Sequence, residues 1–108
     1  MNSTDFIAET KSSYLYNPEM AEILKNAILP EHFLKSPRRL RYSSYAIKHL
    51  LETLIGKYVS NNTCIVAFHE SGFRVYPHGG NSPNCDFNIR KEDVRALATY
   101  LEMESYTC

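Results

Sequence analysis

Apolar residues recur at helical spacing between Ser43 and Gly56. Their order of i, i+3, i+4, i+7 and i+8 places them along one side of an α-helix. Ser43 and Ser44 are candidate N-caps, and a glycine commonly ends a helix. The pattern therefore predicts a helix over residues 44–55 with one buried stripe. The stripe consists of Ile47, Leu50, Leu51, Leu54 and Ile55.

A second, shorter helix is predicted over residues 61–70. Ser60 and Asn61 offer capping side chains just before it. Its apolar residues Cys64, Ile65 and Phe68 share one helical face, and Ser71-Gly72 follows as a stop signal.

The hydrophobic period changes from 3.6 to 2 after Gly72. Phe73 and Val75 alternate with polar neighbours, and so do Cys85, Phe87 and Ile89 further along. The segment 77–84 between these two runs is dense in Gly, Pro and Asn, which are turn residues. Two alternating runs joined by such a loop predict a β-hairpin.

Less regular patterns organise the rest of the chain. Asn17-Pro18-Glu19 predicts the start of a helix, which we expect to stop at Pro30, with a turn or a single helical turn over 31–37. A last helix is expected to begin at Asn88 or Ile89. Residues 1–16 lack a clear period and are expected to form a flexible arm, and residues 105–108 a frayed tail. The prediction is one α+β domain over residues 17–104. Its expected core is Leu50, Leu51, Leu54, Phe68, Phe73, Val75, Phe87, Val94, Leu97 and Leu101.

Two closely connected helices followed by a hairpin match the order of a winged helix-turn-helix. In that arrangement residues 61–71 would be the recognition helix and residues 77–84 the tip of the wing. Asn61, Asn62 and Thr63 are then the candidates to read base edges. However, this helix contains no Lys or Arg and carries Glu70, whereas affinity for DNA depends on cations that meet phosphates.

Charge is distributed unevenly, although the net charge is zero. Residues 35–59 carry six basic residues and one acidic residue, and the segments on either side are acidic. This basic segment is either a binding footprint or a solvated turn. Because arginine and tyrosine dominate interface energetics, we predict a partner-binding surface there. Its predicted residues are Lys35, Arg38, Arg39, Arg41, Tyr42 and Tyr45, and Arg74 with the tip of the hairpin is predicted as a second contact.

No constellation in the sequence indicates catalysis or a cofactor. The three cysteines are odd in number and widely spaced, which argues against a disulfide framework and fits a reducing compartment. His69, His78 and Cys85 match no zinc-binding spacing, so no metal site is predicted. No signal peptide or membrane-spanning stretch is recognisable. We expect a cytoplasmic protein that is not an enzyme, with no cofactor and no membrane partner.

A set of short motifs in residues 43–89 resembles a loose group of short, uncharacterised proteins encoded by bacterial phages and mobile elements. The motifs are Ser43-Ser44-Tyr45 with Lys48-His49, Tyr58-Val59-Ser60-Asn61, Ala67 with Gly72-Phe73, and Pro83-Asn84 with Phe87-Asn88-Ile89. Small proteins of such elements often regulate transcription or inhibit host defence enzymes, and the resemblance implies a role of that kind.

The sequence thus predicts a small non-enzymatic protein that binds a host protein or nucleoprotein complex, for example as an inhibitor of a defence nuclease. The alternative is a winged-helix transcriptional regulator that binds duplex DNA. The absence of cations from residues 61–71 favours the first hypothesis. The oligomeric state stays open.

Overall fold

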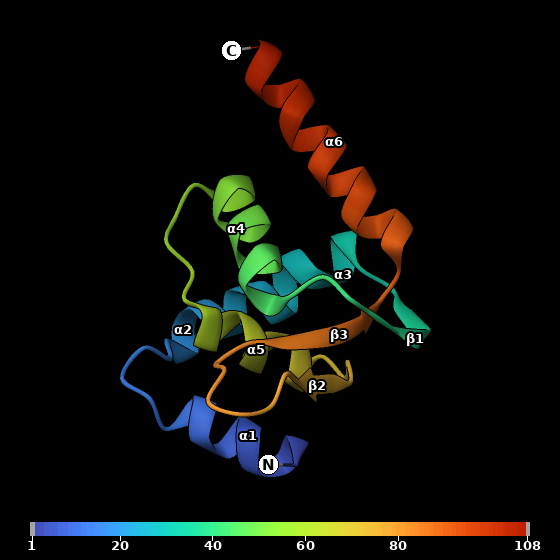
Figure 1. The fold of residues 1–108 in the computed structure, drawn as a ribbon. Helices are drawn as coiled ribbons and strands as arrows, with labels where there is room; N and C mark the ends of the chain where they lie inside the picture. Colours follow the sequence, from blue (N-terminus) through green and yellow to red (C-terminus); the bar gives the residue numbers. More distant parts are fainter. Residues whose placement is uncertain (1, 108) are drawn as a thin grey trace.

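The computed structural model describes the backbone of residues 2–107 and the side chains of residues 2–103. It has the predicted α+β class with a C-terminal helix (Figure 1). In chain order the elements are α1 (Ser3–Lys11), α2 (Pro18–Ile23), the π-helical turn η1 (Leu24–Ile28), α3 (Leu29–His32), β1 (Lys35–Leu40), α4 (Ser44–Ile55), α5 (Asn61–Glu70), β2 (Val75–Pro77), β3 (Cys85–Ile89) and α6 (Lys91–Thr107).

The three strands form one antiparallel sheet in the order β1-β3-β2. β2 and β3 are the two arms of the predicted hairpin, and Val75 pairs with Phe87. The helix pair α4 and α5 followed by this hairpin gives the predicted winged-helix-like core. β1 is the third strand of the sheet, and it pairs with the edge of β3 opposite to β2.

The helix pair begins and ends at the residues that the sequence indicates. Ser43 caps α4 by accepting a hydrogen bond at Oγ from the backbone N–H of Ala46. Gly56 ends α4 in the left-handed region at φ 70°, where a side chain would be strained. Ser60 caps α5 by accepting from the N–H of Thr63.

Pro30 does not stop the first core helix as predicted. The helical run continues to His32, because the turn before Pro30 widens into the π-helical η1. There the N–H of Leu29 donates to the carbonyl of Leu24, five residues back. A wider turn leaves room for the proline ring, which would otherwise meet the carbonyl four residues before it.

The first residues of the basic segment form the strand β1, which the sequence analysis did not predict. Lys35 lies opposite Ile89 and Leu40 opposite Phe87, so five residue steps on β1 face two on β3. The excess forms a bulge around Pro37 and Arg38, both exposed. Proline and a bulge are typical of edge strands, and they hide the alternation that would have identified this strand.

The N-terminal segment also differs from the flexible arm that the sequence analysis predicts for residues 1–16. Residues 3–11 form α1, which packs against α5 and β2 and buries Phe6, Ile7 and Thr10. The carbonyl of Thr10 accepts a hydrogen bond from Asn62 Nδ2, and Lys11 Nζ lies 3.0 Å from Glu70 Oε2. Docking therefore stabilises a helix whose own sequence signal is weak.

The last helix, α6, begins at Lys91, slightly later than predicted. Its helical backbone reaches Thr107, so fraying from residue 105 is wrong for residues 105–107, and residue 108 lies outside the described residues. α6 extends away from the rest of the molecule (Figure 1). Within residues 2–107 no helix has the length and apolar character to cross a membrane.

The core surrounds Phe68 on α5. Its ring lies 4.4 Å from the ring of Phe87, 5.1 Å from that of Phe73 and 5.4 Å from that of Phe33, measured between centroids. Most of the predicted core is buried. The exceptions are Leu50, Leu54 and Leu101, which are only partly buried at its edge.

The packing makes Leu51 and Leu50 a matched pair for a stability test. Leu51 is completely buried, so Leu51→Ala should lower the free energy of unfolding by about 2–5 kcal/mol through lost transfer energy and a residual cavity. Leu50→Ala should cost about 1 kcal/mol, since Leu50 is partly exposed. Chemical denaturation measures both values, and equal losses would show that the stripe is oriented differently.

The docking of α1 predicts that residues of the N-terminal segment contribute to global stability. Phe6→Ala should lower the free energy of unfolding by about 1–3 kcal/mol, limited by the energy with which α1 docks. Glu9→Ala changes an exposed side chain of the same helix and is the control. A melting temperature that Phe6→Ala leaves unchanged would mean that α1 is undocked in solution.

Candidate functional site

The outer face of the sheet carries a buried carboxylate. Cys85, Phe87 and Ile89 face the core, so alternation directs Asp86 and Asn88 to the opposite face. The side chain of Asp86 is only 5% exposed. Oδ2 accepts a hydrogen bond from Arg39 Nε at 2.9 Å and forms a salt bridge with Arg39 Nη2, also at 2.9 Å, and Oδ1 lies 2.9 Å from His78 Nε2. Both carboxylate oxygens of Asp86 are thus used within the chain.

Arg39 connects all three strands. It starts on β1, pairs with Asp86 on β3, and places its guanidinium carbon 5.3 Å from the ring centroid of Tyr76 on β2. Asn88 connects the same three segments in a similar way. Its Nδ2 donates to the carbonyl of Ser36, and its Oδ1 accepts from the backbone N–H of Arg74. These contacts fix the positions of the side chains on this face.

Arg39 lines two hollows on this face. The first, of about 420 Å³, is lined by Arg39, Arg41, Ser43, His78 and Asp86. The second, of about 680 Å³, also includes Arg39, together with Arg74, Tyr76, His69 and the start of α1. We call the residues Arg39, Arg41, Arg74, Tyr76 and His78 the arginine face.

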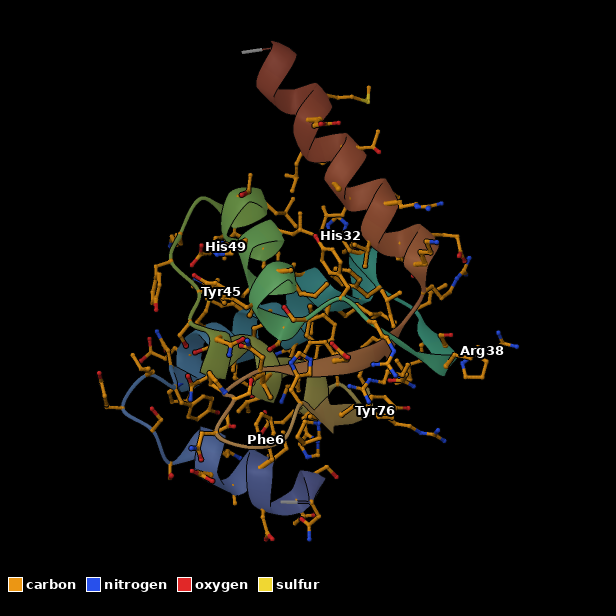
Figure 2. All side chains as sticks on the ribbon, viewed as in Figure 1. Phe6, His32, Arg38, Tyr45, His49 and Tyr76 are labelled. Atoms are coloured by element: carbon orange, nitrogen blue, oxygen red, sulfur yellow. The ribbon has the colours of Figure 1, made fainter. Side chains whose placement is uncertain are left out.

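The arginine face carries excess positive charge. Of the residues that the structure describes, Asp86 is the only acidic one that lines either hollow, and Arg39 neutralises it. Among the described side chains, no carboxylate pairs with Arg41 or Arg74, nor with Arg38 on the adjoining bulge. Figure 2 shows Arg38 reaching outward from β1. The surface therefore presents guanidinium groups that lack a carboxylate partner among the side chains of residues 2–103.

Three of the predicted partner-binding residues lie elsewhere. Lys35 Nζ lies over the ring of Phe73, 5.2 Å from its centroid, at the other end of β1. Tyr42 is partly buried against the core. Tyr45 stands on α4, 46% exposed, with its ring 4.6 Å from that of His49. Figure 2 places Tyr45 on the side of the molecule away from Arg38. The predicted surface is therefore divided.

The predicted base-reading asparagines use their side-chain N–H groups within the chain, whereas Asn61 Oδ1 is buried without a hydrogen-bond partner among the described residues. Asn61 Nδ2 donates to the carbonyl of Pro83 and to Asn84 Oδ1. Asn62 Nδ2 donates to the carbonyl of Thr10 on α1. The side chain of Thr63 is completely buried, 2.7 Å from Ser60 Oγ, which contradicts its predicted role.

The helix that would enter a major groove is closed off. Residues 63–68 of α5 are all buried, because α1, α2 and α4 pack around it together with β2. In Figure 1 α1 lies below α5, on the side opposite α4. A recognition helix needs an exposed face, and α5 does not present one.

The two described cysteines are core residues, as the sequence predicts. Burial raises the pKa of Cys64 well above its usual value, and burial also raises the pKa of Cys85 to about 12. A thiol rather than a thiolate is a poor nucleophile. Among the described residues, no group of three His, Cys, Asp or Glu side chains is arranged to hold a metal ion.

Sequence reasoning identified the arginines but missed Asp86, His78 and Tyr76. Alternation along residues 85–89 places Asp86 away from the core, and a charge there needs a partner. The outward position of Asp86 could therefore be predicted from the sequence. Its pairing with Arg39 could not, because Arg39 lies 47 positions away in a strand that the hydrophobic pattern does not reveal.

The contacts of Arg39 predict that it contributes to stability while its neighbour Arg38 does not. Arg39→Ala leaves Asp86 with His78 alone, so it should lower the free energy of unfolding by about 1–3 kcal/mol, a range reduced for the partial exposure of the arginine. Arg38→Ala should change it by less than about 0.5 kcal/mol. Thermal denaturation compares the two, and equal effects would contradict the ion pair.

Comparisons of this chain with protein-family models, with curated proteins and with solved structures gave no match.

Proposed function

We propose that this chain is a non-enzymatic binding protein that uses its arginine face to contact an anionic surface of a host protein or nucleoprotein complex. The observation that carries the proposal is the charge balance around Asp86. One carboxylate is buried and neutralised, and Arg38, Arg41 and Arg74 remain without acidic partners among the described side chains.

Rigidity supports a binding role for this face. Arg39 and His78 are held by the same carboxylate, and Arg39 also contacts the ring of Tyr76. Side chains already fixed in place lose little conformational entropy when a partner binds. Arginine and tyrosine are also the residue types that most often dominate interface energies.

His78 and Asp86 do not form part of a recognisable nucleophilic triad among the described residues. An aspartate that holds a histidine is also how general bases are oriented, and in such triads the histidine activates a side-chain hydroxyl or thiol beside it. Ser43 is the hydroxyl that lines the hollow, and its Oγ is occupied as the cap of α4. The described thiols are buried in the core.

A DNA-binding regulator is the second candidate, and the winged-helix-like order of elements favours it. The burial of residues 63–68 argues against reading bases through α5. A protein that inhibits a host defence nuclease, as the resemblance to phage and mobile-element proteins implies, needs no free recognition helix. We therefore place the inhibitor first.

Charge reversal tests the proposal. The double variant Arg41→Glu/Arg74→Glu should weaken capture of the host partner by at least about tenfold, because it replaces attraction by repulsion on an exposed surface. Lys57→Glu is the matched control, because Lys57 is exposed in the loop that joins α4 to α5. In Figure 1 that loop runs on the opposite side of the molecule from β1. Quantitative affinity capture from host extract measures both.

Circular dichroism and melting temperature should stay close to wild type for both variants, since neither arginine has a partner within the described chain. Wild-type capture by the double variant, with the control unchanged, would place the binding site elsewhere.

A further inference from the structure

We infer that the group recognised by the arginine face is the phosphate backbone of a nucleic-acid strand, held in the two hollows beside Arg39. This inference rests on the proposed function and specifies which component of the partner is contacted.

The first hollow presents hydrogen-bond donors. Asp86 lines it, yet both of its oxygens already accept hydrogen bonds, so the carboxylate has little capacity to repel an anion. Arg39 uses Nε and Nη2 on Asp86 and has further N–H groups to offer. Arg41 uses none on a carboxylate. Guanidinium groups match the geometry of phosphate oxygens.

The second hollow repeats this chemistry. Arg74 lines it beside Tyr76, and Arg39 is common to both hollows. The cations Arg41, Arg39 and Arg74 therefore extend across the sheet from β1 to β2, a width of roughly 10 Å over two strand spacings.

A row of cations favours a polymer with a charge on every repeat. A single phosphorylated side chain would occupy one hollow and leave the arginine of the other unpaired. A nucleic-acid strand supplies successive phosphates and fits both. Arg38 on the adjoining bulge, also without a carboxylate partner, can extend the contact.

The same geometry predicts contact without sequence reading. The amide N–H groups of Asn61 and Asn62 are used within the chain, and the ring of Tyr76 already has Arg39 over it. Phosphate contacts position a strand and carry no sequence information. Binding should therefore be independent of sequence and strongly dependent on salt.

Fluorescence anisotropy with labelled oligonucleotides of mixed sequence tests this, using one single strand and one hairpin duplex at several salt concentrations. We expect the intact protein to bind at least one of them with a Kd on the order of 10⁻⁵ M near physiological salt. Arg41→Gln and Arg74→Gln should each reduce the slope of log K against log salt by about 1. Lys57→Gln should leave the slope unchanged. Arg39 stays intact, since it also stabilises the fold.

The competing outcomes are distinguishable. Tighter binding of a phosphoserine peptide than of either oligonucleotide, lost in Arg41→Gln, would overturn the inference in favour of a phosphorylated protein. A second outcome is that neither oligonucleotide binds, that nuclease treatment leaves capture of the host partner intact, and that the double variant Arg41→Glu/Arg74→Glu abolishes capture. In that case the inference fails and the proposed function stands. If that double variant captures the partner at wild-type level and no oligonucleotide binds, both fail.

Discussion

Burial of α5 is the constraint on which the rest of the structure depends. Its residues 63–68 are buried without interruption, which a helix can achieve only when other elements cover it on every side. Here α1, α2, α4 and β2 supply that cover. The rings around Phe68 fill the space between α5 and the sheet. This arrangement keeps a winged-helix-like order of elements but removes the surface that such an order usually offers to DNA.

The buried carboxylate of Asp86 is the second constraint. A charge on the central strand must be paired, and Arg39 and His78 approach it from both sides of β3. The pairing draws the edge strand β1 and the end of the hairpin to the same surface. It also explains why the neighbouring arginines are arranged as a group, since they lie on or directly beside the strands that Asp86 connects. The structure of the sheet and the proposed binding surface thus have a common origin on its outer face.

Elements whose signals are local could be predicted from the sequence. α4 and α5 have caps at both ends and an apolar period, and the hairpin has alternation with a turn-rich loop. α1 and β1 could not be predicted in the same way. The helicity of α1 depends on burying Phe6 and Ile7 against distant segments, and β1 contains Pro37 and a bulge that interrupt its alternation.

The residues of the candidate site also differ in whether a local sequence signal reveals them. The clustering of basic residues along the sequence identified Arg38, Arg39 and Arg41, and the predicted hairpin added Arg74. Clustering grouped them with Tyr45, which stands on another side of the fold, and it could not reveal Asp86 as the residue that organises them. Sequence proximity groups residues along a segment, whereas the site is formed across three strands.

The central claim is that partners contact the outer face of the sheet and not α5. Hydrogen–deuterium exchange of the intact protein, alone and bound to its captured partner, tests it most directly. The account predicts slower exchange on binding in residues 36–42 and 73–79, with residues 61–70 unchanged because they are already buried. Slower exchange confined to α1 and α5, with the sheet unaffected, would contradict it.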